Sequence, residues 1–243
     1  MLAARLFRRT LVAALALLAV AGIAGAASTD PQVQIAAADQ AWAESAQLTS
    51  RDLGPGWGAA SGGGGDAGDA TGSGLCPGFS PNESDLVLTG GSSSPNFIRA
   101  DGAVASSAAT VWQSPEHAQA DWDRMVQPGL LSCLASAFSA GSTKKLRIVV
   151  RSKQQVPFPA VAPRTTAYRL ALVFQVSRKV GGKVRKTSVP ARFDLVLLGN
   201  GRATGMLFFV AFNARPLTDA YKQSLAQLLA QRLAADPAAA PSQ

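Results

Sequence analysis

Apolar and polar positions alternate through much of the second half of the chain. Residues 168–176 and 193–197 place an apolar side chain at every second position. Residues 206–212 do the same and are also apolar at the intervening positions. A period of two is typical of β-strands, because successive side chains point to opposite faces of a sheet. Glycines at 181–182 and 199–201 supply turns. The pattern predicts three consecutive antiparallel strands, the third of them central and covered on both faces.

Helical spacing dominates the segments around these strands. Ser114 followed by Pro115 is a strong helix start, and the helix that follows should bury Ala118 and Trp122, with Asp121 and Asp123 off the buried face. Strands are also expected over 104–112 and 146–150, and helices over 36–48, 115–126, 130–138 and 217–233. The predicted fold class is α+β, an antiparallel β-sheet meander packed against helices as an α/β sandwich in one domain.

The N-terminus has the layout of a secretory signal peptide. Arg5, Arg8 and Arg9 precede the apolar run 11–23, and an A-x-A pattern closes it at residues 24–26. We expect cleavage after Ala26 and export to the medium or the cell envelope. Retention as an uncleaved anchor is the alternative. Because residues 8–12 also fit a loose twin-arginine pattern, the export route stays open.

Two cysteines in an exported chain predict one disulfide, between Cys76 and Cys133. It would close a loop of 57 residues, which is worth ~4 kcal/mol on the chain-entropy model. The alternative is a reactive thiol partnered by His117, the one histidine. So few soft ligands cannot build a closed four-ligand zinc site, and we expect neither a metal nor a cofactor.

The chain divides by composition into five stretches. The glycine-rich stretch reads as a linker, because a phosphate-binding loop needs a Lys that it lacks and its two aspartates make only a weak calcium pattern. We expect a signal peptide at 1–26, an N-terminal helix and turn at 27–60, the glycine-rich loop at 61–74, the main α+β domain at 75–235 and a disordered tail at 236–243.

The net charge of +8 is unevenly distributed. Residues 27–139 carry a net charge of −9, whereas residues 140–202 hold fourteen Lys or Arg against Asp194 alone. One interpretation is that these two blocks pair internally at the surface, where each pair is worth ~0 to 1 kcal/mol. The other is a basic contact surface around the predicted hairpin tip, made by Arg178, Lys179, Lys183, Arg185 and Lys186.

The compartment restricts what such a basic surface could contact. Outside the cytoplasm the available polyanions are envelope polymers and anionic lipid headgroups. No aromatic residue lies between Ser177 and Ala191, so the hairpin offers no platform for base stacking. We expect a partner of one of those two kinds, and no nucleic acid.

The sequence contains no convincing catalytic set. Residues 142–145 match the S-x-x-K pattern of penicillin-interacting enzymes, but they precede a predicted strand, where Ser142 and Lys145 would point to opposite faces. No G-x-S-x-G occurs. His117 is expected to be solvated in the first turn of its helix. We therefore predict no catalytic residues.

Several short motifs together resemble a known family. These are the Leu-Gly-Pro-Gly-Trp turn at 53–57, the Cys-Pro-Gly-Phe at 76–79, the strand 104–112 that leads into Ser-Pro-Glu, Trp122 and Cys133. The combination is similar to the extracytoplasmic sensor domains of actinobacterial proteins, the type fused to the mycobacterial serine/threonine kinase PknH, and to their secreted relatives. The resemblance implies an α+β fold with a cleft and an undefined ligand, without catalytic residues. The chain departs from it in having one disulfide where the kinase domain has two.

These observations favour a secreted, non-enzymatic ligand-binding or sensor-like domain of the bacterial cell envelope. Its contact surface would be the basic hairpin or an apolar cleft between helices and sheet that holds a lipid or another apolar small molecule. An envelope-associated hydrolase and a protein-interaction module are the alternatives.

Overall fold

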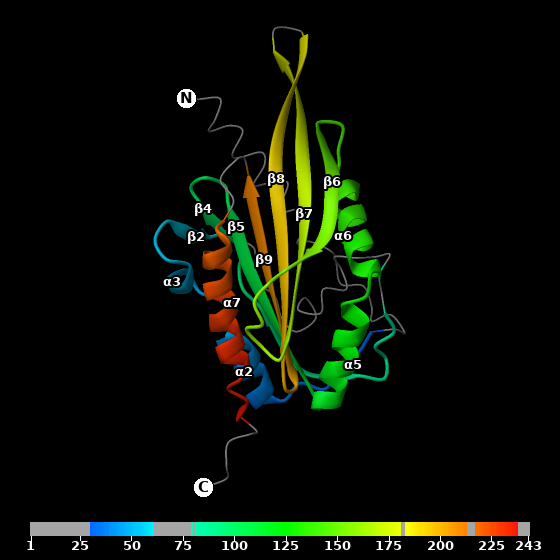
Figure 1. Cartoon of the computed structure of the whole chain (residues 1–243), viewed down its shortest axis with the longest axis vertical. Coiled ribbons are helices and arrows are strands. Elements are labelled where there is room, and N and C mark those ends of the chain that lie inside the picture. The colour runs from blue at the N-terminus through cyan, green and yellow to red at the C-terminus, as the bar shows by residue number, and fades with distance from the viewer. Residues whose placement is uncertain (1–29, 61–78, 80, 181–182, 213–216, 238–243) are drawn as a thin grey trace.

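A nine-stranded mixed sheet runs through the middle of the protein, with helices on both of its faces (Figure 1). The computed structural model describes residues 30–60, 79, 81–180, 183–212 and 217–237. The main strand order is β1-β3-β5-β9-β8-β7-β6, and β2 and β4 join at the side of β5. The strands are β1 (Gln32–Val33), β2 (Trp57–Ala59), β3 (Val87–Ser93), β4 (Phe97–Arg99), β5 (Val104–Trp112), β6 (Leu146–Val156), β7 (Arg164–Val180), β8 (Lys183–Asn200) and β9 (Ala203–Phe212).

The expected fold class is confirmed, and the helices also lie where periodicity placed them. They are α2 (Ala37–Ala46), the short α3 (Ser50–Leu53), α5 (Pro115–Met125), α6 (Gly129–Ala140) and α7 (Asp219–Leu233). Strands β6 to β9 form the predicted antiparallel meander. The sheet is mixed because β1 pairs in parallel with β3. Strands β1 to β4 were not predicted, since they are short or, like β3, interrupted by glycines.

Strand β9 lies in the middle of the sheet and feeds two hydrophobic clusters. Its side chains alternate: Leu207 and Phe209 pack with α2 and α7, whereas Val210 and Phe212 pack with α5 and α6. The prediction of a central strand covered on both faces is therefore confirmed. Because helices cover both faces, the domain has three layers rather than the two of a simple sandwich (Figure 1).

Asp121 of α5 corrects the prediction that it lies off the buried face, because it is only 2% exposed. Residue i+3 on a helix is ~60° from residue i, so Asp121 shares the inward face with Ala118 and Trp122. The prediction was wrong because it treated a charged residue as exposed, although the position of Asp121 on the helix faces the core. Asp123 is exposed and accepts a hydrogen bond from Gln119, as expected of the outer face.

The Leu-Gly-Pro-Gly-Trp turn fastens the N-terminal segment to α7. Gly54 and Gly56 both take positive φ angles, of 81° and 88°, which glycine adopts without a steric penalty. The turn places Trp57 parallel to the ring of Tyr221, at a centroid distance of 6.4 Å. The Tyr221 hydroxyl donates a hydrogen bond of 2.9 Å to the carbonyl of Leu53. The turn that these two glycines allow thus brings Trp57 into contact with Tyr221, which is distant in the sequence.

Two buried ion-pair networks join segments that are distant in sequence. Lys222 of α7 is 2% exposed and lies 2.8 Å from Asp194 of β8 and 2.7 Å from Asp219. Arg202 pairs bidentately with Asp39 of α2 through two hydrogen bonds of 2.7 Å, and it also reaches Asp236, at 2.9 Å. Sequence reasoning missed both networks.

Several predictions fall partly or wholly outside the described residues. The signal peptide, the glycine-rich loop, the turn at 181–182 and most of the tail are among them. Cys133 lies buried on α6, as predicted, but Cys76 is also outside the described residues, so their pairing stays a prediction. Across the described part of the chain, no helix is both long and apolar enough to span a membrane.

Candidate functional site

The β7–β8 hairpin projects beyond the rest of the sheet (Figure 1). The ladder with β6 ends at Val176 of β7, and the ladder with β9 begins only at Ala191 of β8. Among the described residues, 177–180 and 183–186 therefore form a ladder with each other, and one backbone hydrogen bond at the base joins Ser177 to Lys145. Four residues at ~3.3 Å each extend the ribbon by roughly 13 Å past the end of β6.

The composition of β8 helps to keep this ribbon free of further strands. Pro190 lies just before the first residue paired with β9, and its missing N–H cannot continue that ladder. The neighbouring positions Thr187 and Ser188 are exposed and offer no apolar surface for packing. Lysines on exposed strand edges also discourage pairing with other chains. The sequence therefore favours a protruding, solvated hairpin.

All five predicted contact residues lie on this projecting ribbon and are exposed. Arg178 and Arg185 stand directly opposite each other in the register. Like charges at such a cross-strand pair destabilise a sheet. Among the residues that the structure describes, none of the five forms a salt bridge. We name this set, Arg178, Lys179, Lys183, Arg185 and Lys186, the basic tip.

Internal pairing accounts for little of the basic block. No Asp or Glu occurs between Asp123 and Asp194, so Asp194 of β8 is the one carboxylate in the sequence of strands β6, β7 and β8, which carry most of the cations. Of the fourteen cations in residues 140–202, salt bridges within the described part of the chain involve Arg169 and Arg202. Arg202 pairs with Asp39 of the acidic block, whereas the partners of Arg169, Asp194 and Asp219, lie outside that block. Within the described residues, the expected pairing between the two blocks therefore holds for Arg202 only.

Further cations lie next to the base of the ribbon. The backbone N–H of Ser177 donates to the carbonyl of Lys145 at 2.9 Å, which brings the turn before β6 against the hairpin. Lys144, Lys145 and Arg147 are all exposed there. The basic tip is thus continuous with a wider basic surface.

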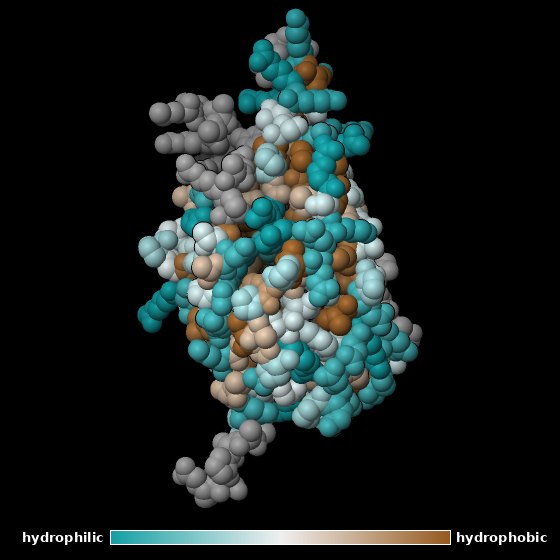
Figure 2. Space-filling model, viewed as in Figure 1, coloured by the Kyte–Doolittle hydropathy of each residue, from teal (hydrophilic) through white to brown (hydrophobic). Residues whose placement is uncertain are grey.

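The ribbon also exposes an apolar side chain among its cations. Val184 is 58% exposed and lies opposite Lys179, between Lys183 and Arg185 in the sequence. In Figure 2 the projecting end is coloured mostly hydrophilic, with a small hydrophobic spot. Single exposed valines are common, but this one lies at the most protruding part of the described chain.

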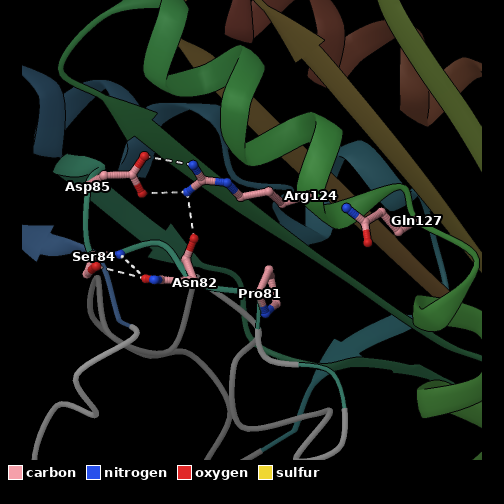
Figure 3. A pocket seen from close by; sticks show the side chains of 6 residues that line it. All are labelled: Pro81, Asn82, Ser84, Asp85, Arg124 and Gln127. Atoms are coloured by element: carbon pink, nitrogen blue, oxygen red, sulfur yellow. Dashed lines mark hydrogen bonds and ion pairs between the residues drawn. The ribbon is translucent and has the colours of Figure 1, made fainter.

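A polar pocket lies against α5 (Figure 3). Its volume is about 470 Å³, and Arg124 crosses it to make two hydrogen bonds of 2.7 Å to the carboxylate of Asp85. Arg124 also donates to the carbonyl of Asn82 at 2.6 Å. Hydrogen bonding from this guanidinium lowers the pKa of Asp85 to about 2. The pocket is lined by Pro81, Asn82, Ser84, Asp85, Arg124 and Gln127.

That lining differs from the apolar cleft expected from the sequence. The pocket's cation is already neutralised by Asp85, which leaves little charge for an anionic ligand. Where the helices meet the sheet, the described side chains pack into the two continuous clusters. An apolar ligand in a cleft between them stays a prediction.

Two carboxyls near this pocket hold their protons unusually tightly. Burial, with a smaller contribution from the charge of Glu83, raises the pKa of Asp121 to about 8. Burial raises the pKa of Glu83 to about 7. Asp121 faces Trp112 and Thr204 of the sheet, and its Oδ2 is the one fully buried side-chain oxygen or nitrogen in the described residues without a hydrogen-bond partner. Asp121 is absent from the pocket lining, so its proton faces the core rather than a substrate site.

His117 is not solvated in the way predicted. The backbone N–H of Val87 donates a hydrogen bond of 3.1 Å to its Nδ1, and this contact joins α5 to β3. The sequence could not predict this contact, because the donor is a backbone N–H on strand β3, which only the tertiary structure brings close to His117. The contact gives His117 a structural role.

The S-x-x-K residues form a turn, not a catalytic helix. The Oγ of Ser142 accepts a hydrogen bond of 2.9 Å from the N–H of Ile148, and Thr143 accepts from the N–H groups of Lys145 and Leu146. The motif therefore shapes the entry to β6. Within the described residues there is no group of three or more His, Cys, Asp or Glu side chains that could hold a metal ion.

Comparison with known proteins gives a distant structural likeness. No protein-family model and no curated protein matches the sequence. The crystal structure of the extracellular domain of PknH from Mycobacterium tuberculosis superposes with a TM-score of 0.41 and 8% identity. The match covers 82% of this chain and 97% of that one. It is a distant resemblance of folds.

Proposed function

We propose that the protein is an exported, non-enzymatic binding domain of the cell envelope, sensor-like in kind, which contacts an anionic partner through the basic tip. The observation that carries the proposal is the charge of the projecting ribbon, where Arg178 faces Arg185 and, among the described residues, neither forms a salt bridge with a carboxylate. An arrangement that costs stability and serves no internal contact is best explained by an external partner. The signal-type N-terminus supports the location.

The structure of the ribbon suits recognition of charge rather than of shape. Its cations are exposed and project from a rigid three-layer body, which lets them reach an extended surface without a change in the core. Clustered charge of one sign also raises the local concentration of a partner of the opposite sign. Binding should weaken steeply with added salt, because exposed charges are screened over ~8 Å at physiological ionic strength.

Binding to immobilised polyphosphate, a soluble polyanion without a lipid, tests the proposal. The chain beginning at Ala27 should bind at low salt, and Arg185→Gln should weaken binding by about threefold to fivefold. Arg178→Gln combined with Arg185→Gln should weaken it by about tenfold or more. The matched control is Arg51→Gln, which removes an equally exposed cation from α3.

Thermal melting separates a binding role from a structural one. If the tip residues serve binding, Arg185→Gln should leave the melting temperature unchanged or raise it, because it relieves repulsion with Arg178. Equal losses in the Arg51 and Arg185 variants would show that only net charge matters. That result would refute a specific role for the basic tip.

A further inference from the structure

Among the described exposed residues, large apolar side chains are few, and Val184 stands out by its position. The others are Val33 and Ile35, near the short edge strand β1 at the opposite edge of the sheet. Val184 alone lies on the projecting ribbon, flanked in sequence by Lys183 and Arg185 and opposite Lys179. Because successive side chains of a strand point to opposite faces, Val184 shares its face of the ribbon with Lys179 and Lys186, while Lys183 and Arg185 lie on the other face. An exposed apolar group with cations on both faces around it is the pattern of a surface that meets both charge and hydrocarbon.

We propose that the basic tip docks on an anionic lipid surface, with Val184 entering the boundary between headgroups and acyl chains while the surrounding cations bind the headgroup phosphates. This inference rests on the proposed function and names its partner. A lipid surface is favoured over a soluble envelope polymer, because a polymer could pair with the cations but would leave the apolar Val184 side chain in water. Lys and Arg beside an anionic leaflet bind it electrostatically, and apolar side chains add affinity through the area they bury.

The geometry of the hairpin allows this approach. The ribbon extends roughly 13 Å beyond β6, so its end can meet a flat surface before the body of the domain does. Lys and Arg have long apolar stems, which let their charged groups stay at headgroup level while the shorter Val184 reaches deeper. The unpaired Arg178 and Arg185 would each gain a phosphate partner and lose their mutual repulsion.

The test is sedimentation of the chain beginning at Ala27 with vesicles, in parallel with polyphosphate binding in the same buffer. Starting at Ala27 removes the apolar run 11–23, which could itself bind lipid. One set of vesicles contains phosphatidylcholine alone, and the other contains equal parts of phosphatidylcholine and phosphatidylglycerol. We expect binding to the anionic vesicles only, and reduction of that binding by salt.

The variant that distinguishes lipid binding from polymer binding is Val184→Thr, which keeps the branched shape of the side chain and replaces one methyl group with a polar hydroxyl. It should weaken binding to anionic vesicles by about fivefold to tenfold and leave polyphosphate binding unchanged. Val33→Thr is the matched control, because Val33 is 60% exposed and lies at the far edge of the sheet. It should change neither readout.

Each outcome has a distinct meaning. Polyphosphate binding that depends on the basic tip, without vesicle binding, would leave the proposed function standing and overturn the lipid assignment in favour of a polymer. Vesicle binding that is equal for Val184→Thr and the unmodified chain would also overturn the role of Val184. Binding to neither probe would refute both proposals.

Discussion

Replacing Asp121 with Asn should stabilise the protein, and more strongly as the pH rises. Asp121 is 2% exposed, its pKa is raised from an ordinary 3.8 to about 8, and its Oδ2 has no hydrogen-bond partner. The folded protein therefore holds this proton more tightly than the unfolded chain does. The resulting stability is fully present below pH 3.8 and is lost as the pH rises toward 8.

The magnitude follows from the two pKa values. With 1.36 kcal/mol for each pH unit between them, complete ionisation of Asp121 costs ~6 kcal/mol, of which ~4 kcal/mol is already lost at pH 7. Because local relaxation and entry of water reduce such penalties, we expect Asp121→Asn to gain ~3 to 6 kcal/mol over the unmodified protein between pH 4 and pH 9.

Urea unfolding followed by tryptophan fluorescence, at a series of pH values, provides the measurement. The quantity to plot is the difference in the free energy of unfolding between the variant and the unmodified chain, because Glu83 titrates in the same range and its contribution partly cancels. The charged or titratable groups that interact with Asp121 or Glu83 include Asp30, Asp85, Arg124 and Arg164.

The matched control is Asp123→Asn, the same chemical change two residues along α5 at an exposed position. It should alter stability by less than ~0.5 kcal/mol at every pH. If the gain from Asp121→Asn is the same at pH 5 and pH 9, burial of an ionising carboxyl is not what the substitution relieves, and the reasoning fails.

Three further substitutions test the packing of the fold by the same unfolding measurement. Lys222→Met leaves Asp194 buried with one cation fewer and should cost ~3 kcal/mol; an unchanged midpoint would show that the pair contributes nothing. Gly90→Ala places a Cβ 2.5 Å from the backbone of Asp39, so it should cost ~1 to 3 kcal/mol, and a neutral result would mean that α2 moves freely away from β3. Cys133→Ser should cost ~4 kcal/mol more under oxidising conditions than after reduction, and an equal cost under both conditions would mean that the predicted disulfide is absent.

Much of the fold could be predicted because its signals are local. Apolar residues at both sets of alternating positions in 206–212 predicted that β9 is covered on both faces, and Ser114 with Pro115 marked the start of α5. These patterns arise because side-chain direction follows a fixed period within one element. The five residues of the basic tip lie together on one ribbon because a hairpin register brings the residues on either side of its turn together, while their contact with an anionic surface stays a prediction.

The rest depended on contacts between distant segments. The sequence alone could not place Lys222 beside Asp194, the N–H of Val87 on His117, or the carboxyl of Asp121 in the core. Each of these contacts depends on a strand that is distant in the sequence. That strand supplies either the hydrogen-bonding partner or part of the surrounding core. Periodicity describes one element at a time and carries no information about its neighbours.

The amino-acid sequence by itself therefore determined the main helices, the strands from β5 to β9, the basic block and the absence of carboxylates between Asp123 and Asp194. Only the tertiary structure decided which of those charges find partners. It enclosed Arg169 and Arg202 with carboxylates from other segments and left Arg178 and Arg185 facing each other on the ribbon. The physical reason is that an ion pair needs two groups within a few ångströms, and chain topology alone sets which distant groups meet.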